Sequence, residues 1–286
     1  MRVASRTMQN WLLPVAALAA WETLGAAGAL PRYLSTPTAI LAALWEIART
    51  GELFTALAAS LYRVAAGFVL GTAGGMLAGL AAGMVPAVRH FFDPLVSFLY
   101  AIPKVAFLPV LLLLLGLGHA SKIALIGFSC FFPVFIASRH AVLSVNKLFV
   151  WAAQNMGAPP RAIFFRVIIP GAAPQLFAGF RIALAHAFVV LFAAELIGSK
   201  AGLGTIISYA EEWVRFDLMF AGILCFATLG FLGDRLLLAI RWRLLKGQMR
   251  SSNGIEYQRA KLLLIRDAIT PALIVSTVLQ YRASGP

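Results

Sequence analysis

Six long apolar stretches, separated by shorter polar segments, constrain the fold of this chain more than any other feature. They run over residues 11–30, 56–85, 91–117, 122–136 or as far as 142, 177–197 and 218–240. A membrane-spanning helix needs about 20 apolar residues. The composition agrees, because 61% of the residues are apolar and 12% are charged, against about 45–50% and about 25% in soluble domains. The pattern predicts an all-α integral membrane protein with six transmembrane helices.

The positions of the lysines and arginines predict an orientation. With the N-terminus in the cytoplasm, most of the basic residues up to residue 250 lie in the inner segments, and most acidic residues lie outside. Cytoplasmic loops of membrane proteins carry this excess of basic residues. We therefore expect a multi-pass membrane protein with both termini in the cytoplasm. Membrane topology also explains the net charge of +13, so no nucleic-acid partner is expected.

Glycine recurs at every fourth residue of the second apolar stretch. The glycines concerned are Gly67, Gly71, Gly75, Gly79 and Gly83. Steps of four residues keep side chains on one slowly drifting face of an α-helix. Such a stripe without side chains allows a neighbouring helix to approach closely, so we expect these glycines to be a helix-packing surface, with a role in lining the pathway as the alternative.

The third apolar stretch contains Pro94, Pro103 and Pro109, and Lys104 lies in its middle. Proline removes a backbone hydrogen bond and bends a helix, and lipid offers no substitute partner. We expect this helix to be bent and packed inside protein.

A long interval, residues 144–175, separates the fourth and fifth stretches and mixes polar with apolar residues. It is predicted as a cytoplasmic loop of short amphipathic helices, with breaks at Gly157, Pro159, Pro160, Pro170 and Pro174. The transmembrane domain is expected to cover residues 1–250. Residues 251–286 form a C-terminal tail to which the sequence assigns no role.

Within this loop, one set of spacings is informative. Trp151, Ala152 and Ala153, then Gly157, then Val167, Ile169 and Pro170 stand at the offsets of the pattern E-A-A-x3-G-x9-I-x-L-P. With this motif the chain resembles the permease subunits of binding-protein-dependent ABC importers, above all the branch for aliphatic sulfonates, taurine and nitrate. Other segments match in order over residues 10–248: Ala101 to Lys104, Gly116 to Gly118, and Ala194 to Gly198 leading to Gly202–Gly204. Trp151 departs from the pattern, where the usual residue is Glu.

The resemblance implies a type I ABC importer permease fold and a function in solute uptake across the bacterial plasma (inner) membrane. A short coupling helix, residues 149–156, would transmit the movement of a separate ATPase, and Arg161 and Arg166 would flank it. The implied partners are a second permease copy, two ATPase subunits and a periplasmic or extracellular solute-binding protein. The solute would be a small molecule, with anions such as sulfonates and nitrate among the candidates. ATP and Mg²⁺ would belong to the ATPase, and no cofactor is expected in this chain.

Ionisable residues at membrane depth are candidates for the pathway, because their burial is costly. Lys104 lies near the middle of the third stretch. It either faces the pathway and attracts an anion, or extends to an interface or pairs with a carboxylate. Glu195, near the outer end of the fifth stretch, is either a gate or a packing and capping residue.

The sequence holds no residues for energy conversion. It lacks the G-x-x-x-x-G-K-[ST] phosphate loop, its four histidines are dispersed, and its two cysteines lie within apolar stretches, so neither a metal site nor catalysis in this chain is expected. An ATP-independent secondary transporter or channel is the alternative function. That class would be expected to show inverted repeats, and none is visible. An integral membrane enzyme would show clustered catalytic side chains.

Overall fold

Every regular element that the structure describes is helical, in a computed structural model that describes residues 2–31 and 33–245. The described side chains begin at residue 12. The predicted tail, residues 251–286, and the domain boundary at residue 250 lie outside the described residues.

Within the described residues, four helices are long and apolar enough to cross a membrane. They are α3 (Glu52–Met84), α6 (His119–Leu143), the continuous helical segment Pro160–Leu196, and the helix Phe216–Leu245. α4 (Pro86–Ala101) together with the segment Lys104–Leu115 makes a fifth candidate if the two are counted as one broken span. The six predicted stretches therefore correspond to four or five candidate spans. The first stretch falls in α1 (Arg2–Ala26), of which the segment Leu12–Ala26, where the described side chains begin, is apolar.

The third stretch is broken more sharply than a bend. The 3-10 helix η1 (Lys104–Phe107) and α5 (Leu108–Leu115) follow α4 at an angle of 93°. Ile102 is extended at the break, with φ −77° and ψ 133°, the conformation favoured before a proline. The prediction of a segment packed inside protein does not hold within this chain, because α4 buries only Val96 and α5 only Leu108.

The predicted breaks at Pro170 and Pro174 are wrong. α8 (Pro160–Ile163), the π-helical turn η2 (Phe164–Ile168) and α9 (Ile169–Leu196) form one helical segment of 37 residues. In the π turn the Ile169 amide donates to the Phe164 carbonyl, which shifts the hydrogen-bond register just before Pro170. Such a turn allows a proline near the start of α9 without ending the helix.

α6 is the most buried of the four candidate spans and packs against α3 and α9. The glycine stripe of α3 lies against α6. A Cβ added at Gly67 would lie 2.7 Å from Ile126 Cβ, and one at Gly83 would lie 2.7 Å from Val142 Cβ. At the three glycines between them, an added Cβ would meet α6 backbone atoms at Gly127, Phe131 and Phe135. The two helices are therefore in backbone-to-backbone contact over this stripe.

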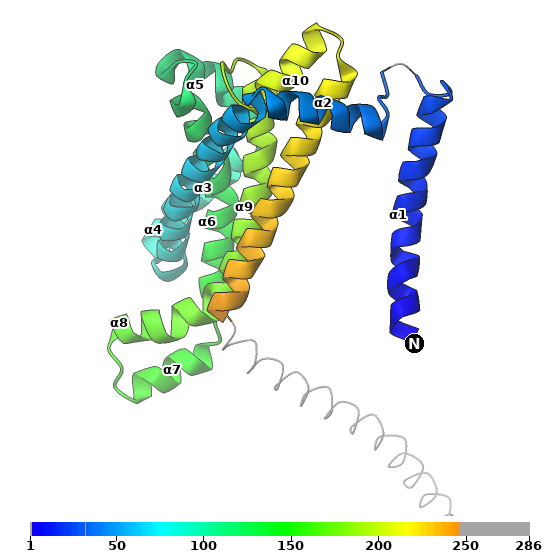
Figure 1. Ribbon diagram of the computed structural model, residues 1–286. Helices are drawn as coiled ribbons and strands as arrows, with labels where there is room; N and C mark the ends of the chain where they lie inside the picture. The colour runs from blue at the N-terminus through cyan, green and yellow to red at the C-terminus, as the bar shows by residue number, and fades with distance from the viewer. Residues whose placement is uncertain (1, 32, 246–286) are drawn as a thin grey trace, which may run out of the picture. The chain divides into compact units, whose positions relative to one another are not determined.

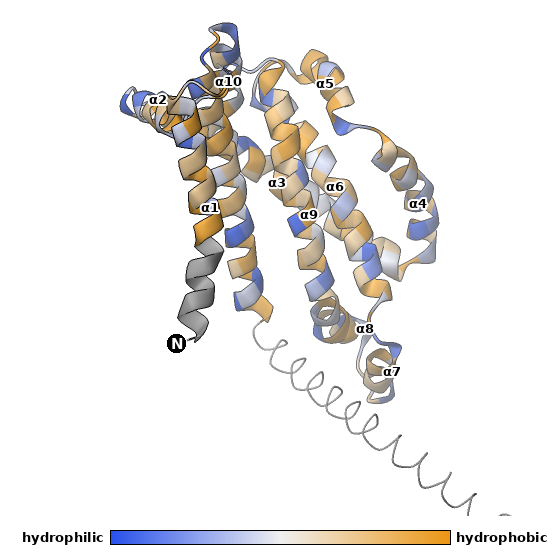
Figure 2. Ribbon diagram, turned by 90° about the vertical axis from the view of Figure 1, so that its right-hand side faces the viewer, coloured by the Kyte–Doolittle hydropathy of each residue, from blue (hydrophilic) through white to orange (hydrophobic). Residues whose placement is uncertain are grey.

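Three short helices lie at the ends of the spans. α7 (Lys147–Asn155) precedes the long α8–α9 segment at one end, and α2 (Pro37–Arg49) and α10 (Leu203–Glu212) lie at the other (Figure 1). Figure 2 shows α5 and most of α3 in the colours of hydrophobic residues. The chain thus has two distinct ends, an α7 end and an α10 end, on either side of an apolar middle.

Candidate functional site

The α7 end carries a short, well-terminated helix. Asn146 caps its start, because its side-chain oxygen accepts a hydrogen bond of 2.9 Å from the Leu148 amide. Gly157, with φ +74°, ends it in a Schellman motif: the Gly157 amide donates to the Gln154 carbonyl and the Ala158 amide to the Ala153 carbonyl. Both ends of α7 are thus fixed by its own sequence.

The surface of α7 is unusually apolar for a loop. Trp151 is 55% exposed, Phe149 66% and Met156 80%, and Ala152 is exposed too. Ala153 is buried and faces the rest of the chain. Exposed large apolar side chains clustered on one short element are typical of a protein-interaction surface.

The second half of the spacing motif lies beside α7. Arg161 is in α8, Arg166 and Val167 are in the π turn, and Ile169 and Pro170 begin α9. α7 packs against both α8 and the π turn. The structure therefore brings the two halves of the motif together, at the start of the helical segment that runs to Leu196.

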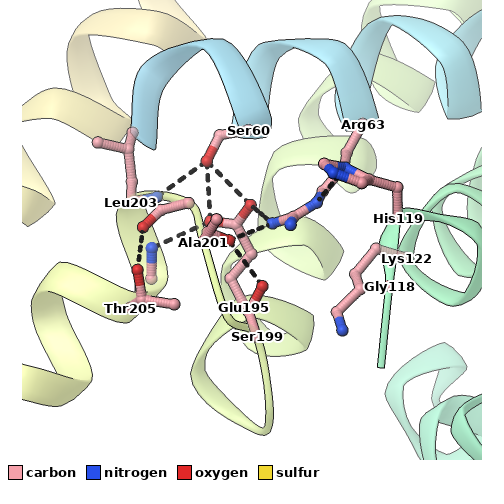
Figure 3. Close-up of polar contacts among 12 residues, drawn as sticks. Ser60, Arg63, Gly118, His119, Lys122, Glu195, Ser199, Ala201, Leu203 and Thr205 are labelled. Atoms are coloured by element: carbon pink, nitrogen blue, oxygen red, sulfur yellow. Dashed lines mark hydrogen bonds and ion pairs between the residues drawn. The ribbon is translucent and has the colours of Figure 1, made fainter. Parts of the chain in front are cut away.

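At the other end of that segment, Glu195 lies in a buried polar cluster, the Glu195 cluster (Ser60, Arg63, Lys122 and Glu195; Figure 3). The Arg63 guanidinium lies 2.6 Å from Glu195 Oε1. The Ser60 hydroxyl lies 2.9 Å from both oxygens of the carboxylate. Glu195 also accepts a 3.0 Å hydrogen bond from the Gly204 amide. Its carboxylate thus caps the first turn of α10, where the free amides of a helix favour negative charge.

Two buried cations donate hydrogen bonds to the loop between α9 and α10. Arg63 also donates to the Ala201 carbonyl at 2.6 Å. Lys122 donates to the Gly198 carbonyl at 2.9 Å and to the Leu117 carbonyl at 2.6 Å. Each cation therefore holds one end of the loop to a different helix, Arg63 to α3 and Lys122 to α6.

Two glycines leave room for the Glu195 carboxylate at the start of α10. A Cβ at Gly202 would overlap the Glu195 carboxylate, and one at Gly204 would overlap Glu195 Cβ. Gly202 also has φ +123°, which an L-residue with a side chain rarely adopts. The loop geometry and the buried carboxylate therefore depend on each other.

Sequence reasoning identified Glu195 but not its partners Ser60, Arg63 and Lys122. Arg63 carried a usable signal, because it is an arginine within a long apolar stretch, and such a residue requires a buried partner. The sequence pattern does not indicate which partner that is.

Lys104 lies at the break between α4 and η1. Its ammonium donates to the carbonyls of Ile102 at 2.9 Å and Leu99 at 3.2 Å, and to the Tyr100 carbonyl. The aromatic rings of Tyr100 and Phe132 lie 4.8 and 5.2 Å away. Lys104 therefore caps the C-terminus of α4, the end of a helix that favours a cation, and it forms no ion pair with a described carboxylate.

These features define a class: a polytopic α-helical membrane protein with an apolar helical projection at one end of its spans and a buried ionic cluster at the other. The described residues contain no group of histidine, cysteine or acidic side chains that could hold a metal ion. Residues 71–246 match the family of binding-protein-dependent transport system inner membrane components. The chain belongs to this family. It is a multi-pass permease subunit of an ABC importer, and the ATPase, with its ATP and Mg²⁺, is a separate chain.

Two relatives support this membership and the resemblance inferred from the loop motif. The permease protein SsuC of Bacillus subtilis (strain 168), whose name assigns it to aliphatic sulfonate transport, is 34% identical over 240 residues, covering 84% of this chain and 87% of the relative. The taurine transport system permease protein TauC of Escherichia coli (strain K12) is 34% identical over 219 residues, covering 75% and 80%.

A solved structure supports the fold. A chain of the inward-facing MetNI methionine ABC transporter matches with a TM-score of 0.51 and 22% identity, covering 68% of this chain and 96% of that chain. At this identity the match bears on the fold alone.

Proposed function

We propose that this chain forms half of the translocation pathway of an importer for small sulfonates such as taurine, and that an ATPase drives it through α7. The observation that carries the coupling role is the geometry of α7: a capped helix, closed by Gly157, that exposes Phe149, Trp151 and Met156. A rigid apolar projection of this kind fits a groove in a partner protein. Trp151, in place of the usual Glu, adds apolar area to this surface and removes a charge from it.

We further propose six spans with both termini in the cytoplasm. Beside the four long helices, the other two spans are the broken segment α4–α5 and the helix α1. The excess of basic residues on the α7 side supports this orientation. It places the coupling loop, residues 144–175, in the cytoplasm and the Glu195 cluster near the outer face.

The full assembly is proposed as two copies of this chain, two ATPase subunits and a solute-binding protein outside the membrane. ATP binding would close the ATPases, move α7 and turn the cavity outward, and hydrolysis would reset it. The continuous helical segment Pro160–Leu196 supports a mechanical link between the two ends, because a helix of that length is a stiff element.

The proposed solute class rests on the sulfonate and taurine relatives and on charge. Lys104 is not neutralised by any described carboxylate, so its positive potential remains available to an anion. We propose that Lys104 contributes to the attraction of the sulfonate group.

Co-purification with the ATPase tests the coupling role. Phe149→Arg and Trp151→Arg are expected to abolish association of co-expressed ATPase subunits, while the chain remains in the membrane fraction. Trp213→Arg is the matched control, because Trp213 is a comparably exposed tryptophan (65%) next to α10. Unchanged association of both α7 variants would contradict the coupling role. Solute accumulation by the purified chain without an ATPase would favour a secondary transporter.

A further inference from the structure

A small cavity lies beside the Glu195 cluster, between the end of α9 and α10. Its volume is 210 Å³, and its polar lining consists of Glu195, Ser199, Thr205, Ser208, Tyr209 and Glu212. No lysine, arginine or histidine lines it, although the chain as a whole has a net charge of +13. The lining thus carries two carboxylates, and the buried cations Arg63 and Lys122 contact it from behind at Glu195 and Gly198.

Three of the four hydroxyl groups of this lining already donate to backbone carbonyls. Ser199 donates to the Ala201 carbonyl at 2.7 Å, Thr205 to the Gly202 carbonyl at 2.6 Å and Ser208 to the Leu196 carbonyl at 3.3 Å. Because a hydroxyl has one proton and two lone pairs, all three remain available only as acceptors. At these three positions a ligand must bring the hydrogen-bond donor, whereas the Tyr209 hydroxyl can donate as well as accept.

The two carboxylates differ in what they can still bind. Glu195 is neutralised by Arg63 and accepts bonds from Ser60 and Gly204. Glu212 forms no hydrogen bond or ion pair with its side chain to any residue that the structure describes. Glu212 supplies the uncompensated negative charge of the lining.

We propose that this cavity binds the primary ammonium group of the transported solute at the outer mouth of the pathway. An ammonium has three N–H donors and no acceptor, which complements the hydroxyl and carboxylate oxygens. The ring of Tyr209 adds an aromatic surface that attracts cations. A divalent metal ion fits less well, because it requires several carboxylate or carbonyl ligands.

This inference rests on the proposed function and narrows its solute class. It selects solutes that carry both an ammonium and a sulfonate, such as taurine, over alkyl sulfonates of similar length that have no amine. At about 30 Å³ for each water-sized group, the cavity has room for a small amine.

The test is competitive uptake of taurine and ethanesulfonate by cells that express the complete transporter. Glu212→Gln is expected to lower the taurine-to-ethanesulfonate uptake ratio about tenfold, the loss typical of one charge-assisted hydrogen bond. Ser208→Ala is expected to lower the ratio less. Glu211→Gln is the matched control, because this neighbouring acid is exposed but does not line the cavity, and it is expected to leave the ratio unchanged.

The outcomes separate the inference from the proposed function. If both sulfonates are taken up and Glu212→Gln does not change their ratio, the inference is wrong and the importer function stands. If the wild-type transporter takes up neither sulfonate, the proposed function itself fails. In a second measurement, ethylammonium should inhibit taurine uptake by the wild type but not by Glu212→Gln. Equal inhibition by Na⁺ at the same concentration would overturn the specificity for ammonium.

Discussion

The Arg63 guanidinium lies 2.6 Å from the Glu195 carboxylate, with both side chains buried to 3% exposure or less. The pair joins α3 to the end of α9. Because both charges have left water, their mutual attraction must offset a large desolvation cost. The cost is reduced here by additional hydrogen bonds from Ser60 and the Gly204 amide.

Removing one member of this pair is expected to be far more harmful than removing both. Arg63→Met or Glu195→Met alone leaves an uncompensated buried charge, which typically costs about 3–5 kcal/mol of stability. The double variant Arg63→Met/Glu195→Met should lose less than the sum of the two single changes. Thermal unfolding of the detergent-purified protein measures this, and strictly additive losses would contradict a coupled buried pair.

The Arg181–Asp234 pair provides the control. It has the same N–O distance, 2.6 Å, but the Arg181 side chain is 58% exposed. Exposed ion pairs contribute about 0–1 kcal/mol. Arg181→Met is therefore expected to lower the unfolding temperature less than Arg63→Met does.

A second prediction concerns the glycine stripe. Gly71→Ala places a Cβ against the Gly127 carbonyl oxygen of α6, whereas Gly74→Ala places its Cβ 3.6 Å from Phe131 Cδ2, an ordinary contact. Gly71→Ala is expected to destabilise the protein by about 1–3 kcal/mol through overpacking. Gly74→Ala should be neutral or slightly stabilising, because alanine favours a helix over glycine. Equal unfolding temperatures for the two variants would argue against close α3–α6 packing.

The sequence predicts those features that depend on neighbouring residues. The end of α7 at Gly157 and the break near Pro103 follow from local backbone chemistry, and both occur in the structure. The failure at Pro170 also has a local cause. A π turn is not encoded in a simple pattern of apolar residues and prolines, so the sequence predicted a break where the helix continues.

The Glu195 cluster was beyond sequence reasoning for a different reason. Arg63 is separated from Glu195 by 132 positions, and Lys122 from Gly198 by 76. Their meeting depends on how α3, α6 and α9 pack, and hydrophobic periodicity does not specify the neighbours of a helix. The three hydroxyls of the cavity beside Glu195 that remain only as acceptors were equally hidden, because their state depends on which carbonyl each of them contacts.

A third prediction concerns how the contact between Glu46 and Arg215 depends on pH. Glu46 of α2 accepts hydrogen bonds from Arg215 at 3.0 and 2.8 Å, and this contact with the guanidinium holds the pKa of Glu46 below its usual value. A carboxylate with a lowered folded-state pKa stabilises the fold above its unfolded-state pKa, about 4.3, and this contribution is lost as the pH falls through the folded-state value.

The contact between α2 and Arg215 should therefore persist at neutral pH and loosen only below the usual glutamate pKa of about 4.3. Hydrogen exchange of α2 amides, measured from pH 7 downward and corrected for intrinsic rates, reports this. Glu46→Gln should show the faster exchange already at neutral pH. If Glu46→Gln shows an acid-induced change of the same size, that change is caused by the titration of another group.

The last prediction separates two roles of Lys104. Its ammonium contacts three carbonyls at the end of α4, and no described carboxylate neutralises its charge. Lys104→Arg keeps the charge, whereas Lys104→Met keeps the apolar stem alone. If the charge attracts the solute, Lys104→Met should reduce sulfonate uptake several-fold at an unchanged amount of assembled transporter, and Lys104→Arg should retain most of it. In the opposite outcome, Lys104→Met lowers the unfolding temperature and the amount of assembled transporter while uptake per assembled complex stays normal. That result would show that Lys104 acts only as the cap of α4, because an anion in the pathway would respond to the missing charge.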